Sequence, residues 1–225
     1  MRRKQFRHEH KYYLTPGNAD ILRRRVHSLL CRDRHSNGAY RISSLYFDDM
    51  YDTCLHEKQS GVFVRDKWRM RWYNDSLDPV HLERKHKEGE LGHKQHDRVS
   101  QEQYHRLCAG DMSVAAGQAG AVWEAFYQLH SLRRLRPVVT VIYEREAFSY
   151  DPGNVRVTFD SGLRAAVPGS AVSLPVCDGL TILELKYDSF LPSVVGRLLS
   201  GLQFTQLALS KYVMARHALM DCGFA

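Results

Sequence analysis

One stretch, residues 61–73, constrains the fold of this chain more than any other. Its sequence, GVFVRDKWRMRWY, alternates between two kinds of side chain, and successive side chains of a β-strand point to opposite faces. One face carries a row of cations spaced about 6–7 Å apart by the strand rise: Arg65, Lys67, Arg69 and Arg71. The other face is mostly apolar and includes two tryptophans. Taken alone, such a strand would be explained by a surface hairpin with a solvated basic face.

The same alternation recurs along the chain. Segments 82–87, 141–145, 155–160 and 183–187 each place charge on one face, and residues 7–11 do so near the start. Together the charged faces hold Arg7, Glu9, Lys11, Arg65, Lys67, Arg69, Arg71, Glu83, Lys85, Lys87, Arg145, Arg156, Asp160, Glu184 and Lys186. A dry, unpaired charge is prohibitively costly, so this lining needs water or a ligand. Because cations outnumber carboxylates, the natural occupant is a polyanion such as a nucleoside triphosphate or inorganic polyphosphate.

Periodicity and turn residues place the elements. Strands are predicted at 5–13, 40–48, 61–73, 80–87, 137–148, 154–160 and 180–187. Helices are predicted after an Asn18 cap, from the Ser100 capping box and over 120–134. A C-terminal helical region is predicted from Pro192 onward, with an apolar stripe through Phe204, Leu207, Met214 and Ala218 and a candidate break into two helices at Gly201. Residues 109–121 are predicted to be a surface loop. The fold class is therefore α+β, an antiparallel β-barrel charged inside and covered outside by helices, in a single domain spanning residues 1–225.

Charge and cysteine content limit the cellular setting. The formal charge of +7 favours an anionic partner without choosing among nucleic acid, phosphate-rich ligands and acidic membrane surfaces. The five cysteines are widely spaced without a CxxC pair, which fits a reducing cytoplasm better than a disulfide framework or zinc ribbon. We see neither a secretory signal nor a stretch of about 18 apolar residues, and therefore expect a cytoplasmic protein without an intrinsic membrane segment.

The carboxylates on the charged faces suit a divalent metal. A triphosphate brings Mg²⁺ or Mn²⁺, and these hard cations take carboxylate oxygens. Glu9 and Glu184 are the predicted metal ligands. Glu83 fits a metal or a counter-charge equally well, and Asp160 is expected to be a counter-charge. His8 and His10 lie on the face opposite Glu9 and are expected to be surface or packing residues.

Motifs along most of the chain resemble the catalytic domain of the vacuolar transporter chaperone (VTC) family, within the triphosphate tunnel metalloenzymes. They are EHKYYL (9–14), YRISSLYFDD (40–49), RDKWRMRWY (65–73), LERKHKEG (82–89), YEREAF (143–148), VRVTFD (155–160), LELKY (183–187) and SKY (210–212). The resemblance implies an eight-stranded antiparallel tunnel with a C-terminal helix near its end. It also implies a polyphosphate polymerase, which passes the γ-phosphate of ATP to a growing chain and requires Mn²⁺ or Mg²⁺.

The resemblance assigns roles by position. The residues that would grip phosphate and carry catalysis are Lys11, Arg69, Arg71, Lys85, Arg145, Arg156 and Lys186. Tyr143 would also touch phosphate, Ser210 and Lys211 would reach in from the C-terminal helix, and Glu184 would hold the metal. Arg65, Lys67 and Lys87, which lie on the charged faces, join the substrate-binding group. Lys211 also falls inside the predicted apolar stripe, where it is either functional or a lysine that snorkels along the edge.

Two departures from the wider superfamily narrow the expected function. Many tunnel enzymes begin with ExExK, but Arg7 stands here in place of the first glutamate, and a later ExE is replaced by Glu184-x-Lys186. Both changes replace a carboxylate by a cation, which weakens a second metal site and favours a longer anion. We therefore expect a metal-dependent polyphosphate polymerase acting on ATP or another nucleoside triphosphate.

Several alternatives stay open. A metal-dependent triphosphatase acting on inorganic, nucleotide or RNA 5′ triphosphate differs only in its acceptor, and a non-catalytic polyphosphate-binding module would need no metal. A nucleic-acid binder is disfavoured, because Trp68 and Trp72 lie on the face opposite the arginine row, where packing explains them better than base stacking. The sequence leaves open whether a separate membrane partner takes up the product.

Overall fold

The computed structural model of the chain describes residues 8–33, 38–89 and 91–224. The described residues form six α-helices, two short 3₁₀ helices and ten strands, and the recorded strand registers are antiparallel. The predicted α+β class with an antiparallel sheet is confirmed. Among the described residues the recorded strand order is open at both ends, so the pairing does not show the predicted closure into a barrel. Arg7 lies outside the described residues.

The chain divides into two compact units, each built from separate segments. Unit 1 comprises Met1–Arg41, Tyr143–Leu163 and Cys177–Leu209, and unit 2 comprises Ile42–Ile142, Arg164–Val176 and Ser210–Ala225. Two long strands, β7 (Arg136–Tyr150) and β8 (Val155–Ala166), contribute residues to both units. A single domain over residues 1–225 stays a prediction.

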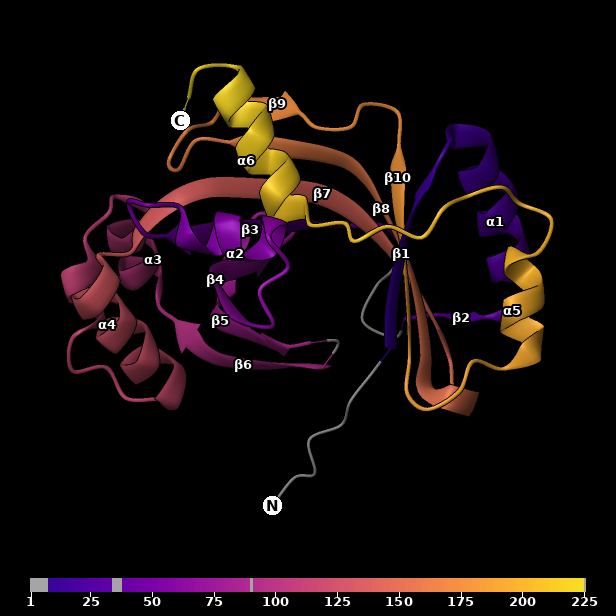
Figure 1. Ribbon diagram of the computed structural model, residues 1–225, viewed down its shortest axis with the longest axis horizontal. Helices are drawn as coiled ribbons and strands as arrows, with labels where there is room; N and C mark the ends of the chain where they lie inside the picture. Colours follow the sequence, from indigo (N-terminus) through magenta and orange to yellow (C-terminus); the bar gives the residue numbers. More distant parts are fainter. Residues whose placement is uncertain (1–7, 34–37, 90, 225) are drawn as a thin grey trace. The chain divides into compact units, whose positions relative to one another are not determined.

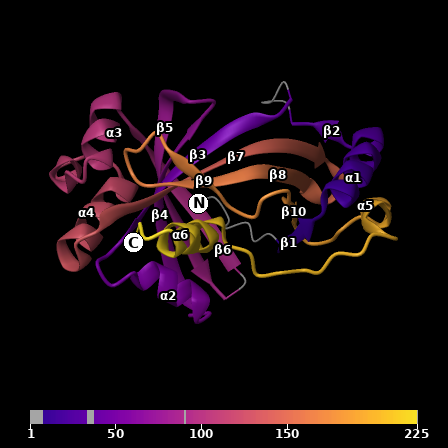
Figure 2. The same cartoon turned by 90° about the horizontal axis from the view of Figure 1, so that it is seen from above.

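Unit 1 is a sheet with two helices on one face. Its further elements are β1 (His8–Leu14), α1 (Pro16–Leu29), β2 (Cys31–Arg32), the 3₁₀ helix η2 (Pro152–Asn154), β10 (Thr181–Tyr187) and α5 (Ser193–Leu199). The strand order is β1–β10–β8–β7, with β2 paired to β7. Helices α1 and α5 lie side by side next to β1 and β10 in both views (Figures 1 and 2). Leu22 of α1 and Val195 of α5 are buried in one apolar cluster with Phe159 and Leu183 of the strands.

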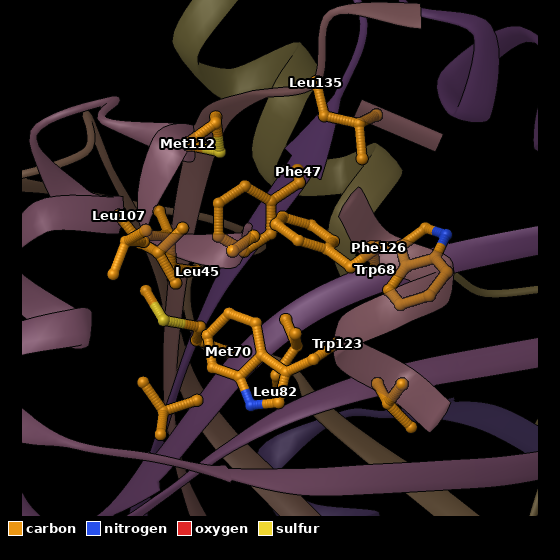
Figure 3. Packing of buried hydrophobic residues seen from close by; sticks show 14 of the residues in the cluster. Leu45, Phe47, Trp68, Met70, Leu82, Leu107, Met112, Trp123, Phe126 and Leu135 are labelled. Atoms are coloured by element: carbon orange, nitrogen blue, oxygen red, sulfur yellow. The ribbon is translucent and has the colours of Figure 1, made fainter. Parts of the chain in front are cut away.

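Unit 2 has the larger hydrophobic core. Its further elements are β3 (Tyr40–Asp48), α2 (Thr53–Gln59), β4 (Val64–Tyr73), β5 (Ser76–Glu88), β6 (Leu91–Val99), α3 (Gln101–Cys108), the 3₁₀ helix η1 (Met112–Ala115), α4 (Ala121–Arg133), β9 (Ser173–Pro175) and α6 (Lys211–Asp221). The strand order is β7–β3–β4–β5–β6, and β9 pairs with β8. Phe126 of α4 packs against Phe47 and Trp68, with ring centroids 5.0 and 5.4 Å away (Figure 3). The tryptophans of β4 are therefore core residues, as the alternation predicted.

Local signals placed some helices correctly. Ser100 and Gln103 form the predicted capping box at the start of α3, and α4 matches the predicted segment closely. The predicted Asn18 cap is wrong, because Thr15 caps α1 and its hydroxyl accepts the N–H of Asn18 at 3.4 Å. Pro16 occupies the first helical position, where its missing N–H costs nothing.

The prediction of one helical stripe from Phe204 to Ala218 is also wrong. Helix α5 ends at Leu199 and α6 begins at Lys211, so Phe204 and Leu207 are not helical. The predicted break at Gly201 is confirmed, because its φ of 75° ends the helical conformation, and the following segment runs beside β1. There the N–H of Leu207 donates to the carbonyl of Lys11 at 2.9 Å. Because Lys211 opens α6, a stripe passing through Leu207 gives no support for its role.

The sequence patterns did not predict three further elements. Strand β6 has polar side chains on both faces, and it is extended because it pairs with β5 along its whole length. Helix α2 is short, and the carboxylate of Asp48 accepts two of its backbone N–H groups. Residues 112–115, inside the predicted loop, form η1 and bury Met112 and Val114. No helix in the described part of the chain is long and apolar enough to span a bilayer.

Candidate functional site

Strands β1, β10 and β8 place charges on one face of unit 1. The register sets Glu9 opposite Lys186 and Lys11 opposite Glu184, and β10 in turn sets Lys186 opposite Arg156. Directly opposed residues point to the same face of a sheet, so these five side chains share one face. The alternate residues of the same strands face α1 and α5 and form the apolar cluster.

Glu9, Lys11, Glu184 and Lys186 form a compact network of alternating charge, here called the four-charge network. Lys11 Nζ lies 3.3 Å from Glu9 Oε1 and 3.7 Å from Glu184 Oε1. Lys186 Nζ lies 3.6 Å from Glu9 Oε1 and 3.3 Å from Glu184 Oε2. The Glu184 side chain is 7% exposed, so its charge depends on these partners more than on water.

Arg145 of β7 extends the network on its buried side. Its Nε and a terminal nitrogen each lie 2.6 Å from an oxygen of Asp160, and the same terminal nitrogen lies 3.4 Å from Glu184 Oε2. Burial opposes the guanidinium charge, but the carboxylates outweigh it and raise the pKa of Arg145 above its ordinary value. Its guanidinium carbon also lies 5.3 Å from the ring centroid of Tyr143. Asp160 is therefore the counter-charge that the sequence predicted.

Among the described cations of this face, Arg156 is the most accessible. Its side chain is 38% exposed and pairs with Asp33 at 2.8 Å, while Tyr40 lies 3.4 Å from one of its nitrogens. Next to it on β8, the hydroxyl of Thr158 is buried and makes no hydrogen bond among the described residues. Thr158 lies directly opposite Glu184, so an unsatisfied hydroxyl lies next to the proposed metal carboxylate.

Unit 2 presents a second charged face, formed by β3, β4, β5 and β6. Arg69 lies between two partners, with its Nε 2.8 Å from Glu83 and a terminal nitrogen 2.9 Å from the Tyr46 hydroxyl. Arg71 donates to the Ser44 hydroxyl at 3.0 Å. These contacts hold both arginines on the face opposite the Trp68 core, as the alternation predicted.

The cations of this face shift the pKa of two buried partners. Burial alone would raise the pKa of Glu83, but Arg69, Arg71 and Lys94 outweigh it and hold that pKa far below its usual range. Burial likewise opposes ionisation of Tyr46, yet Arg69, Arg71 and Lys211 lower the pKa of its phenol. Glu83 lies 2.8 Å from Lys94 as well as from Arg69 and is a counter-charge.

Like charges oppose one another along the remaining rows of this face. Lys67 lies opposite Lys85, and Lys85 lies opposite Lys94 on β6. Arg65 lies opposite Lys87 in the next row. Like charges directly opposite one another destabilise a sheet, so these rows favour an anion that binds over them.

The start of α6 reaches this face. Ser210 caps the helix, and its hydroxyl accepts a hydrogen bond from Lys67 Nζ at 2.9 Å. Lys67 Nζ also lies 5.5 Å from the centroid of the Tyr212 ring. Ser210 and Lys211 thus lie beside the cations of β4, although the sequence patterns had placed Lys211 mid-helix.

The model of the VTC domain matches residues 6–220. The chain belongs to the VTC domain family. No curated protein matches the sequence.

Solved structures similar to this VTC domain share little of its sequence. A Pyrococcus horikoshii OT3 protein is 13% identical, with 96% of this chain and 99% of that chain covered and a TM-score of 0.47. A candidate adenylate cyclase from Bacillus halodurans is 13% identical, with 98% and 91% covered and a TM-score of 0.49. Another from Vibrio parahaemolyticus is 12% identical, with 97% and 88% covered and a TM-score of 0.45.

The carboxylates of the four-charge network fit a metal that arrives with phosphate. Within residues 8–33, 38–89 and 91–224, no group of three or more His, Cys, Asp or Glu side chains is arranged to hold a metal by itself. Mg²⁺ commonly takes only one or two carboxylates and completes its shell with waters and substrate phosphates. Glu9 and Glu184 share both lysines and supply that number of carboxylates. The donor set fits Mn²⁺ or Mg²⁺ bound together with a phosphate ligand.

Sequence patterns missed several residues of these faces. Four of them lie beside predicted site residues: Tyr46 beside Arg69, Thr158 opposite Glu184, and Asp33 and Tyr40 beside Arg156. A fifth, Lys94, pairs with Glu83 and lies in strand β6, which the sequence patterns did not predict. Thr158 had a usable signal, because it shares strand parity with Arg156 and Asp160. Tyr46 had none, since only the register with β4 places it opposite Arg69. Lys94 had none, since only the register with β5 assigns it to the charged face.

Proposed function

We propose that this VTC domain is a metal-dependent polyphosphate polymerase that transfers the γ-phosphate of ATP, or of another nucleoside triphosphate, to a growing inorganic polyphosphate chain. The observation that carries the proposal is the row Lys67–Lys85–Lys94, in which like charges face one another directly. A polyanion with repeated phosphates offsets such a row, and the predicted tunnel would thread it.

Positioning and charge neutralisation carry most of a phosphoryl transfer, whose transition state spreads charge over the equatorial oxygens. In unit 1, Lys11, Arg145 and Lys186 bind and orient the phosphates, helped by Arg156 and by the hydroxyl of Tyr143. Glu184, aided by Glu9, would hold Mn²⁺ or Mg²⁺, which when bound neutralises charge on phosphate oxygens at the scissile bond. No side chain is assigned as a covalent nucleophile, because the terminal phosphate of the chain is the acceptor.

In unit 2, a second group of residues binds the polyphosphate chain. Its members are Arg65, Lys67, Arg69, Arg71, Lys85, Lys87, Ser210 and Lys211. Tyr46 and Glu83 orient Arg69 through their hydrogen bonds, so the guanidinium is ordered before the anion arrives.

Charge and thiol chemistry also bear on the setting of the reaction. All five cysteines are free thiols, which supports an activity in the reducing cytoplasm. The proposed ligands are nucleoside triphosphate and polyphosphate rather than nucleic acid. Uptake of the product by a separate membrane partner is compatible with this role.

The test is to incubate the pure protein with ATP and Mn²⁺, with and without a short polyphosphate primer. Products are followed on a polyphosphate-stained gel and by a free-phosphate assay. We expect polymer from the wild type and from the exposed control Arg24→Gln, and at least a hundredfold less from Lys186→Gln and Arg71→Gln. Normal activity in both site variants would refute the assignment.

The same experiment separates the alternatives. Free phosphate without polymer identifies water as the acceptor and the chain as a triphosphatase. Tight, metal-independent binding of polyphosphate without either product identifies a binding module.

A further inference from the structure

We propose that the imidazoles of His81 on β5 and His96 on β6 form a proton-linked phosphate subsite on the charged face of unit 2. The two side chains are called here the histidine pair. The inference rests on the proposed function and deepens it, because it makes the binding of the polyphosphate chain depend on pH.

The sheet register places the histidine pair on the same face as the proposed phosphate-binding cations. His81 lies directly opposite Arg71 of β4 on one side and Arg98 of β6 on the other. His96 lies directly opposite Glu83. Directly opposed residues of a sheet point to the same face, so an anion bound at Arg71 lies beside His81.

The histidine pair is open to an anion. The two ring centroids lie 5.0 Å apart in an edge-to-face arrangement. His81 is half-buried and His96 is exposed. Within residues 8–33, 38–89 and 91–224, neither imidazole makes a hydrogen bond. An imidazole that takes up a proton has two N–H donors, so each ring can donate to a phosphate oxygen.

The surroundings of the histidine pair on this face are strongly charged. The titratable and charged groups that face it are Tyr46 of β3, Arg69 and Arg71 of β4, Glu83 and Lys85 of β5, and Lys94 and Arg98 of β6. Asp78 pairs with Arg98. Helix α3 covers the opposite face of β5, where Leu107 joins the apolar core. Cations therefore predominate around both imidazoles.

These surroundings favour the neutral form of His81 in the ligand-free protein. Burial and the neighbouring His96 lower the pKa of His81, and Lys94 and Arg98 add to that effect. Glu83 opposes them without outweighing them. At neutral pH the free protein therefore holds His81 ready to take up a proton.

Bound phosphate reverses this balance. A phosphate chain over Arg71 and His81 adds negative charge, which favours the imidazolium and raises the pKa of His81 in the complex. The gain in affinity is fully present below the pKa of the free protein, which is itself lowered from about 6.5. It is lost as pH rises through the pKa of the complex. The affinity for polyphosphate should therefore fall between pH 6 and pH 8.

The first test is an NMR titration of the imidazole signals, with and without short-chain inorganic polyphosphate in Mg²⁺. His81→Gln identifies the His81 signal by its loss, and the exposed His56 of α2 is the internal control. We expect polyphosphate to raise the pKa of His81 by about 1 and to leave the His56 signal in place.

The second test measures the affinity for the same polyphosphate by calorimetry at pH 6 and pH 8. We expect His81→Gln to bind about fivefold more weakly than the wild type at pH 6 and within about 1.5-fold of it at pH 8. His96→Gln should also weaken binding at pH 6. The matched control His56→Gln should bind like the wild type at both pH values.

The outcomes separate this inference from the proposed function. If polyphosphate binds but leaves the pKa of His81 unchanged or lowers it, the proton-linked subsite is refuted and the proposed function is left intact. The same conclusion follows if His81→Gln weakens binding by the same factor at both pH values. If the wild type binds no polyphosphate at either pH, the proposed function fails and the subsite fails with it.

Discussion

The phenol of Tyr212 donates a hydrogen bond to the carboxylate of Asp48, which is fully buried. The same carboxylate accepts the backbone N–H groups of Asp49, Cys54 and Leu55 at 2.9, 2.9 and 3.1 Å. Burial and the nearby charge of Asp48 raise the pKa of Tyr212, so the phenol remains a donor. The contact ties the first turn of α6, next to Ser210 and Lys211, to the start of α2.

Replacing Tyr212 by phenylalanine tests this tie. The variant removes one hydrogen bond to a buried charge, and we expect a loss of about 2 kcal/mol of unfolding free energy. Urea unfolding measures the change. Tyr127→Phe removes a hydroxyl from a partly exposed tyrosine of α4 and should change stability by only a few tenths of a kcal/mol. Equal effects in the two variants would show that the Asp48 contact contributes nothing.

Glu83 should give a pH-dependent contribution to stability. Its pKa in the folded protein is lowered, so its contribution is present above the unfolded pKa, near ~4.3, and is lost as pH falls toward the folded pKa. Glu83→Gln leaves Arg69 and Lys94 without their carboxylate, and we expect a loss of about 3 kcal/mol at pH 7. The gap between wild type and variant should narrow below about pH 4. The measurement is the unfolding free energy of both proteins at pH 7 and pH 3, with the exposed Glu88→Gln as control. A difference between wild type and Glu83→Gln that is the same at both pH values would contradict the role of Glu83 as a counter-charge.

A pair of glycine substitutions should differ sharply. Gly120 has φ 125°, and an added Cβ would collide with the Asp97 carboxylate, which accepts the N–H of Val122 at 2.9 Å at the start of α4. We expect Gly120→Ala to lose about 3 kcal/mol through backbone strain and a displaced cap. A Cβ at Gly17 of α1 meets nothing within 4 Å, so Gly17→Ala should be neutral or slightly stabilising. Thermal unfolding of both variants checks this, and similar melting temperatures would contradict it.

Lys85 should support ligand binding more than it supports the fold. It lies in register between Lys67 and Lys94 on the charged face, so Lys85→Met should change the stability of the ligand-free protein by no more than about 0.5 kcal/mol. It should also weaken tripolyphosphate binding about tenfold by removing a charge-assisted hydrogen bond. Urea unfolding and calorimetry measure the two effects, with Lys58→Met of α2 as the control. A variant that is less stable yet binds normally would show that the row serves packing instead.

Metal removal should stop catalysis without unfolding the protein. The carboxylate of Glu184 already lies within 3.7 Å of three cations, Lys11, Arg145 and Lys186, so the fold needs no metal to neutralise it. We expect a chelator to abolish polymer formation, to leave the melting temperature within about 1 °C, and to be reversed by Mn²⁺. A large fall in melting temperature would instead indicate a structural metal.

Which side chains share a face could be predicted from the sequence, because the period of two is a property of each strand alone. The row from Arg65 to Arg71 and the pair Glu184 and Lys186 were therefore assigned correctly before any partner was known. Ser100 was also predictable as a cap, since its capping box lies within four residues.

The partner of each charge was decided only by the tertiary structure, because register joins segments far apart in the chain. Asp160 became the partner of Arg145, and Lys94 entered the charged face through β6, whose polar sequence carries no periodic signal and becomes extended only by pairing with β5. The prediction of a helix around Leu207 was wrong for the same reason. The local sequence there favours a helix, but the N–H of Leu207 hydrogen-bonds to the backbone of β1. Local alternation thus determined the chemistry of each face, and long-range pairing determined which charges meet.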